Sequence, residues 1–249
     1  MTLDPRPAIR RALGSPWWLV AAWWTLLAPG AVGAAAEESA FSRARQEMVE
    51  RQLRARDITD ATVLRVMGKV PRHQFVSRAW IGHAYADRAL PIDEGQTISQ
   101  PYIVALMTQL LELTGTERVL EVGTGSGYQA AVLAEIVREV RTIEILPGLA
   151  AAADRRLKEL GYATVRVRAG DGYLGWPDAA PFDAIIVTAG ATHIPEPLVA
   201  QLAEGGRLVI PVGSAPGIQE LLQGRKIQGR LVTRVIAPVR FVPLVEPAR

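Results

Sequence analysis

The sequence of 249 residues contains no cysteine. This absence excludes disulfide bonds, thiolate metal ligands and cysteine nucleophiles. Histidine is scarce as well: His73, His83 and His193 are scattered along the chain, and none shows the spacing of metal ligands. We therefore expect no metal site.

Dense basic runs are also missing. The chain carries a formal net charge of +3, but Arg6, Arg10 and Arg11 lie in the first 36 residues, where the only acid is Asp4. The rest of the chain is therefore close to neutral. It offers no electrostatic case for binding nucleic acid.

Charged side chains are absent from residues 12–36. Arg10 and Arg11 precede an apolar stretch at 17–28, and small residues follow at 29–36. This pattern is typical of a secretory signal peptide and predicts a leader at 1–36. Two alternatives stay open: an uncleaved membrane anchor, and a true start of the protein at Met48.

The remainder, 37–249, predicts a single α/β domain, because 49% of the residues are apolar and the length suits one large core. Residues 37–117 indicate a mainly helical segment, with a loop-rich stretch at 80–101. Residues 118–213 alternate between strands and helices, which predicts a doubly wound, mostly parallel sheet. Residues 214–249 predict an antiparallel edge. The expected strands are 118–122, 140–145, 164–168, 182–188 and 207–212, and the expected helices are 41–67, 102–113, 128–137, 148–160 and 196–203.

A glycine-rich turn follows the first of these strands and opens the next helix. Such glycines let the backbone turn tightly and come close to a nucleotide-type ligand. Dehydrogenases use a similar turn, but their fingerprint requires glycine or alanine where this chain has Tyr128. The turn therefore favours a methyl-donor cofactor over NAD. Its candidate cofactor-binding residues are Glu121, Gly123, Thr124, Gly125, Ser126 and Gly127.

Three acids stand at the ends of three successive predicted strands. Glu121 occupies the position where methyltransferases carry an acid that faces the amino-acid end of the cofactor. Glu144 ends the second strand and suits a ribose diol, and Asp171 follows the third strand, next to Gly172. The alternative is that each acid is an ordinary solvated residue. Together they predict a nucleoside site for S-adenosyl-L-methionine.

Two nucleic-acid methyltransferase classes do not fit this chain. Cytosine C5 methylation uses a cysteine nucleophile, which the sequence lacks. Amino-methylating DNA enzymes usually carry an acid/Asn-Pro-Pro-aromatic motif after the fourth strand, where this chain has Thr188-Ala189-Gly190-Ala191. The acceptor is therefore expected to be something other than DNA.

Seven segments between about Phe41 and Val245 resemble the protein-L-isoaspartate (D-aspartate) O-methyltransferases. The piece most specific to that family is the Gln-Thr-Ile-Ser sequence within the second segment. The segments are VPRHQFV at 70–76, GQTISQP at 95–101, the turn at 119–129, GDG at 170–172, PFDAIIVTA at 181–189, GGRLVIPVG at 205–213 and VRFVPL at 239–244.

The resemblance implies a Rossmann-like class I methyltransferase fold with S-adenosyl-L-methionine as methyl donor. The implied substrates are age-damaged proteins and peptides that carry L-isoaspartyl (or D-aspartyl) residues. Methylation of the abnormal carboxylate gives an ester that closes to a succinimide, whose hydrolysis returns some normal aspartate. Two alternatives from the residues themselves are a small-molecule methyltransferase and a non-catalytic binding protein that keeps the fold.

The resemblance also implies roles for single residues. Ser99 matches the active-site serine of the family, although its position alone would equally suit a cap for the helix that begins near Pro101. Val242 lies in a predicted edge strand at 239–245, which would pair with a substrate backbone or simply complete the sheet. The further substrate-binding candidates are Thr97, Gln100 and Ala189.

We expect a monomer that meets a membrane only through an uncleaved leader. The compartment is left as two alternatives. Family resemblance and cofactor supply indicate the cytoplasm, whereas a genuine leader at 1–36 indicates the periplasm.

Overall fold

The computed structural model describes residues 29–214 and 217–245. The arginines and apolar stretch of the predicted leader, at 1–28, lie outside the described residues. Residues 29–36 form the first turns of helix α1 (Pro29–Met48). The chain divides into two compact units, Met1–Glu37 and Glu38–Arg249. Among the helices of the described ranges, none has the length and apolar character needed to span a membrane.

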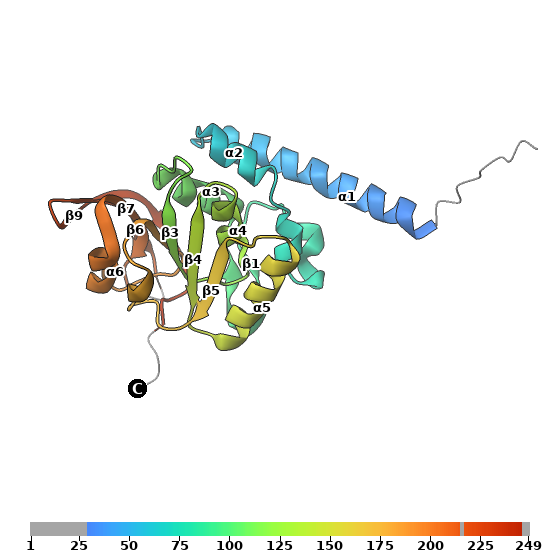
Figure 1. Ribbon diagram of the computed structural model, residues 1–249. Coiled ribbons are helices and arrows are strands. Elements are labelled where there is room, and N and C mark those ends of the chain that lie inside the picture. Colours follow the sequence, from blue (N-terminus) through green and yellow to red (C-terminus); the bar gives the residue numbers. More distant parts are fainter. Residues whose placement is uncertain (1–28, 215–216, 246–249) are drawn as a thin grey trace, which may run out of the picture. The chain divides into compact units, whose positions relative to one another are not determined.

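The second unit is built on a seven-stranded sheet (Figure 1). Its first five strands run parallel, and the last two pair antiparallel with their neighbours. This arrangement confirms the predicted mostly parallel α/β fold with an antiparallel C-terminal edge. In spatial order the strands are β5 (Val165–Ala169), β4 (Glu139–Glu144), β3 (Arg118–Val122), β6 (Phe182–Val187), β7 (Leu202–Val212), β8 (Gln219–Ile227) and β9 (Arg230–Val239).

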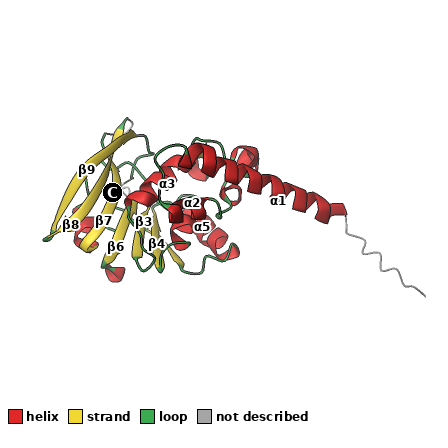
Figure 2. Cartoon of the chain, turned by 90° about the horizontal axis from the view of Figure 1, so that it is seen from above, coloured by secondary structure: helices red, strands yellow, loops and turns green. Residues whose placement is uncertain are grey.

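Both faces of the sheet are covered, as continuous apolar strands require. Because side chains alternate along a strand, Val119 and Val209 join one core while Leu120 and Leu208 join the other. The first core also receives the N-terminal helices, and Figure 2 shows α3 and α5 on that side. The second receives Leu198 of α6. The helices are α2 (Ala61–Met67), α3 (Pro101–Leu110), α4 (Tyr128–Ala134), α5 (Pro147–Glu159) and α6 (Glu196–Gln201).

The N-terminal segment is more broken than the expected single helical region at 41–67. Helix α1 passes into a π-helix at Val49–Arg54, and α2 begins only after Asp60, whose side chain accepts hydrogen bonds from the Thr62 and Val63 amides. The loop-rich stretch contains a small antiparallel pair, β1 (Leu90–Pro91) and β2 (Thr97–Ile98). Short 3₁₀ turns occupy Arg72–Phe75, Arg78–His83, Asp93–Gly95 and, later in the chain, Pro177–Ala179.

The predicted edge strand at 239–245 is wrong. Strand β9 ends at Val239, and the following residues turn across the carboxyl end of the sheet. There the Gly190 amide donates to the Val242 carbonyl at 2.8 Å, and the Leu244 amide donates to the Gly190 carbonyl at 2.8 Å. The C-terminal edge strand of the sheet is β9, which pairs with β8 on one side and with no described strand on the other.

The chain order creates a switch point beside β3. Strand β4 pairs with one side of β3, and β6, which comes later, pairs with the other. Loops that leave these strands at their carboxyl ends therefore diverge, which leaves a crevice where open α/β sheets bind ligands.

Candidate cofactor and substrate site

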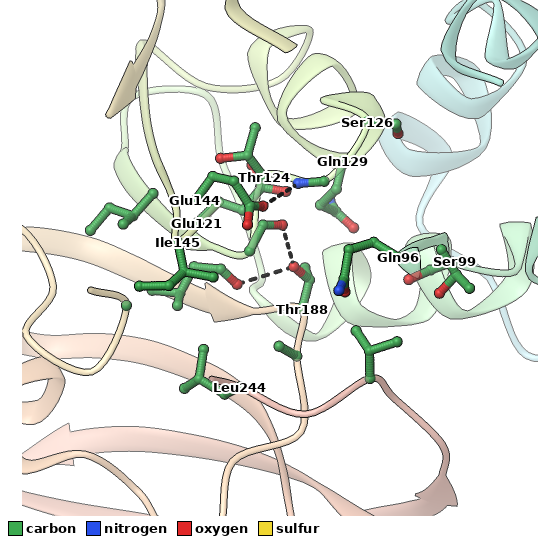
Figure 3. Close-up of a pocket in the computed structure, with 18 of the residues that line it drawn as sticks. Gln96, Ser99, Glu121, Thr124, Ser126, Gln129, Glu144, Ile145, Thr188 and Leu244 are labelled. Carbon is green, nitrogen blue, oxygen red and sulfur yellow. Dashed lines mark hydrogen bonds between the residues drawn. The ribbon is translucent and has the colours of Figure 1, made fainter. Parts of the chain in front are cut away.

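A cavity lies at the carboxyl ends of β3, β4 and β6. In Figure 3, Glu121, Glu144 and Thr188 gather on one side of it, and Gln96 and Ser99 lie on the other. It is lined by 96–99, 121–126, 143–145, 188–189 and 242–245, with Val104, Tyr128, Gln129 and Gly172.

The glycine turn needs its first two glycines for close backbone approach. Gly123 has φ +101°, and a Cβ there would lie 2.6 Å from the Thr188 hydroxyl oxygen, which itself donates to the Gly123 carbonyl at 2.6 Å. Gly125 has φ +53°, and its amide donates to the Glu144 carboxylate at 2.8 Å. The Thr124 hydroxyl is fixed at 2.7 Å from that of Thr142. The turn is therefore held from both sides.

Gly127 plays a different part from its neighbours. It does not line the cavity. It has φ +88° at the start of α4, and a Cβ there would come within 3.2 Å of Leu157 in α5. The third glycine thus serves helix packing, while Tyr128 beside it is buried, with its ring edge-on to Phe75 at 5.5 Å.

Glu121 is the most unusual group in the cavity. Its side chain is 0% exposed, and neither carboxyl oxygen has a hydrogen-bond partner within the described part of the chain. Burial raises the pKa of Glu121 to about 8; the Thr142 side chain opposes this shift in part, and the nearby Glu144 carboxylate adds a smaller contribution in the same direction as burial. Such a group is costly unless it is paired, so it fits a ligand that brings positive charge or hydrogen-bond donors.

Glu144 is buried but satisfied. One carboxylate oxygen accepts from the Gly125 amide, and the other accepts from the Leu146 amide at 3.2 Å. A carboxylate has about four lone-pair sites, so two remain for the hydroxyls of a ribose. Glu121 and Glu144, predicted together from sequence, are therefore brought to one cavity.

Asp171 is not brought there. It is absent from the cavity lining, and one of its carboxyl oxygens accepts from the Tyr173 amide at 2.9 Å. Its neighbour Gly172 does line the cavity, and a Cβ at Gly172 would lie 2.5 Å from Val122. The third strand end thus contributes a small residue rather than an acid.

A second cavity adjoins the first. The two share Thr97, Ser99, Thr188 and Val242. Gln100 lines only the second cavity, where its amide donates to the Asp87 carboxylate at 2.8 Å, and Ala189 lines only the first. We call this second cavity the groove. The rest of its lining consists of Ala89, Ile103, Ile218, Pro238, Val239, Arg240 and Phe241.

Ser99 stands on the wall between the two cavities. The N-cap of α3 is Gln100, and no side chain caps this helix. No hydrogen bond from the Ser99 hydroxyl is formed within residues 29–214 and 217–245. The alternative role of Ser99 as a helix cap therefore has no support in the geometry, and its hydroxyl is left for a ligand.

Sequence reasoning missed Thr188 and four of the groove residues, Ala89, Ile103, Ile218 and Pro238. Thr188 lies in a segment that the resemblance covered, but nothing marked its hydroxyl as the contact that holds Gly123. His193 stacks on Tyr173 at 5.7 Å and bonds to Thr192, away from the cavity lining. Among the described residues, no three histidine, aspartate or glutamate side chains are grouped as metal ligands would be.

The doubly wound sheet, the glycine turn at its switch point and the two acids that face one cavity define a class I methyltransferase. Residues 43–249 match the family model described as protein-L-isoaspartate(D-aspartate) O-methyltransferase. The chain belongs to this family. Membership confirms the family that the sequence segments predicted, and with it S-adenosyl-L-methionine as the cofactor; the small-molecule alternative is not favoured.

Curated relatives and a solved structure agree with this assignment. The protein-L-isoaspartate O-methyltransferase 2 of Shewanella sediminis is 56% identical over 205 residues, which cover 82% of this chain and 84% of the relative. That of Syntrophobacter fumaroxidans is 52% identical, with 94% and 98% covered. A Plasmodium falciparum structure, described as this methyltransferase in complex with S-adenosyl-L-homocysteine, has a TM-score of 0.71 and 27% identity, and the match covers 81% of this chain and 98% of that one.

Proposed function

We propose that this enzyme transfers a methyl group from S-adenosyl-L-methionine to the L-isoaspartyl (and D-aspartyl) carboxylates of damaged proteins. The resulting ester starts repair through a succinimide. The observation that carries this proposal is the meeting of the cofactor cavity and the groove at Ser99, within the segment most specific to the family.

The cavity fits the cofactor chemically. The unpartnered Glu121 carboxyl suits the positively charged amino-acid end, and the spare lone pairs of Glu144 suit the ribose hydroxyls. When bound, S-adenosyl-L-methionine supplies an electrophilic methyl group on a positively charged sulfur. The backbone of Gly123 to Ser126 and the small residue Gly172 leave room for it. Gly127 and Asp171 support the site through helix packing and loop geometry.

The acceptor needs no general base. A carboxylate with a pKa near 4 is already ionised at neutral pH. The task of the chain is therefore to orient the acceptor oxygen and to exclude water, which would stabilise separated charges. The Ser99 hydroxyl, a small neutral donor, would orient the carboxylate, and Thr97, Gln100, Ala189 and Val242 would line its surroundings.

The test is methyl transfer from labelled S-adenosyl-L-methionine to two peptides that differ only in isoaspartate against aspartate at one position. We expect base-labile label in the isoaspartyl peptide alone. Equal labelling of both peptides would contradict the proposed specificity. Tight cofactor binding without labelling of either would move the function to a small-molecule acceptor.

We also propose that the enzyme works as a monomer and meets its partners only as substrates. Light scattering at micromolar concentration would show a mass near 27.0 kDa for the intact chain. Cell fractionation with sequencing of the mature N-terminus distinguishes the two compartments. An exported protein would be cleaved near Ala36, whereas a protein that starts at Met48 would have no leader and would stay in the cytoplasm.

A further inference from the structure

Among the described residues that line the groove, Arg240 is the one that is ionisable. Its side chain is exposed, and it forms no hydrogen bond, ion pair or ring contact with any described part of the chain. Two other arginines of the sheet are paired with acids: Arg207 with Glu117 at 3.3 Å, and Arg118 with Glu139 at 3.2 Å. The groove therefore carries one uncompensated positive charge.

No acid belongs to the described lining of the groove, and Glu220 stands opposite Pro238 on the neighbouring strand. Asp87 lies behind Gln100 and is already ion-paired with Arg56 at 2.5 Å. Glu121 and Glu144 are buried in the cofactor cavity and are absent from the groove. An anionic group that enters the groove would therefore meet attraction from Arg240 and no carboxylate among the described lining residues.

The backbone that carries Arg240 is held firmly in place. The Phe241 amide donates to the Gln219 side chain at 2.9 Å, and the Val242 carbonyl accepts from the Gly190 amide at 2.8 Å. Arg240 stands two residues from Val242, which lines both cavities, so the two Cα atoms are at most about 7 Å apart. That spacing is about one to two residues of an extended peptide.

We infer that Arg240 selects damaged sites that have an acidic side chain next to the isoaspartyl residue. The inference rests on the proposed function, because it places the isoaspartyl carboxylate at Ser99 and a neighbouring side chain in the groove. Attraction to Arg240 would favour glutamate at that neighbour, and repulsion would disfavour lysine. Since the arginine is exposed, salt should weaken the preference.

The experiment compares isoaspartyl peptides of one sequence with Glu, Gln or Lys at the residue before, or the residue after, the damaged position. We expect kcat/KM of the wild-type enzyme to be about three- to tenfold higher for Glu than for Lys at one of these positions at low salt, as for a partly solvated ion pair. The ratio should fall towards one at 0.5 M NaCl. Arg240→Gln should abolish the ratio, and Arg240→Glu should invert it.

Arg230→Gln is the matched control. Arg230 begins the same strand, is exposed, and does not line the groove, so its loss removes the same charge and should keep the ratio. A wild-type Glu-to-Lys ratio within twofold at both positions would overturn the inference. So would a ratio that Arg240→Gln retains, or a fall in kcat for the Gln peptide in that variant, which would place Arg240 at the reacting carboxylate. Failure to methylate even the Gln peptide would instead refute the proposed function.

Discussion

Two buried glutamates stand at opposite ends of strand β3, and the fold treats them in opposite ways. Glu117, just before the strand, accepts from the Thr114 amide and hydroxyl at 2.8 Å each and from the Gly115 amide at 2.9 Å. Burial alone would raise the pKa of Glu117, but these hydrogen bonds outweigh it and lower the pKa to about 2. Glu121, inside the strand, forms no hydrogen bond through its carboxyl oxygens with the described residues, and burial raises its pKa to about 8.

The difference separates structure from function within one strand. The amino end of a parallel sheet is away from the ligand site, so a buried acid there must be satisfied by the protein itself. The carboxyl end faces the crevice, and a buried acid there can be left for a ligand to satisfy. Ser99, whose hydroxyl is also without a partner in the described structure, belongs with Glu121 in this comparison.

The largest effect is expected at Ser99. Ser99→Ala removes the donor proposed to orient the acceptor carboxylate, so kcat should fall by roughly tenfold to a thousandfold. The Kd for the cofactor should change little. Steady-state kinetics on an isoaspartyl peptide measures the first quantity, and calorimetry the second. Ser77→Ala, at an exposed serine, is the control; near-normal turnover of Ser99→Ala would remove the proposed role.

Glu121→Gln should weaken cofactor binding by about a hundredfold, since hydrogen bonds to a charged partner contribute about 1.5–3 kcal/mol. The matched variant Glu117→Gln makes the same chemical change at the other end of β3 and should bind the cofactor normally. Calorimetric titration of both variants with S-adenosyl-L-methionine decides the matter. Equal loss of affinity in the two variants would contradict the claim that Glu121 binds the cofactor while Glu117 serves only the fold.

The same two variants should affect stability in the opposite way: Glu117→Gln should destabilise the protein, and Glu121→Gln should not. Glu117→Gln turns an acceptor of four hydrogen bonds into an amide whose NH₂ faces donors, so the free energy of unfolding should fall by about 2 kcal/mol. Glu121→Gln removes a buried, unpaired carboxyl, so without cofactor it should unfold at higher denaturant concentration than the wild type at pH 8.5. Urea denaturation at constant protein concentration measures both. A stabilised Glu117→Gln protein would contradict the structural role of that residue.

The pH dependence of stability should have opposite slopes for the two acids. Glu121 has a folded-state pKa near 8, above its unfolded value, so the wild type without cofactor loses stability relative to Glu121→Gln as pH rises from about 4.5 to 8. Glu117 has a depressed pKa, so its advantage over Glu117→Gln is lost as pH falls from about 4.5 towards 2. Each slope is at most about 1.4 kcal/mol per pH unit. Parallel pH profiles for the wild type and the matching variant would show that the acid in question does not titrate differently on folding.

Much of the fold was predictable because its signals are local. Hydrophobic runs between turns placed β3, β4, β5 and β6 within a residue or two of their observed bounds. Boundaries failed where pairing across the sheet decides them. Strand β7 begins at Leu202 rather than 207, because Leu202 pairs with Phe182 beyond an irregularity in the ladder. The stretch after Val239 leaves the edge because Gly190 captures its backbone.

The features of the site also fall into those that the sequence predicts locally and those that depend on long-range packing. The glycine turn, Glu121, Glu144 and the Gln-Thr-Ile-Ser segment are contiguous or periodic features, and the sequence by itself determined a nucleoside cofactor, the family and the residues on which to test it. Only the tertiary structure decided that Gly127 and Asp171 stay out of the cavity, that Thr188 holds the turn, and that Arg240 joins Ser99 at one groove. The physical reason is distance along the chain. Such contacts join segments more than 60 residues apart, and the packing of the sheet and its crossing loops brings them together.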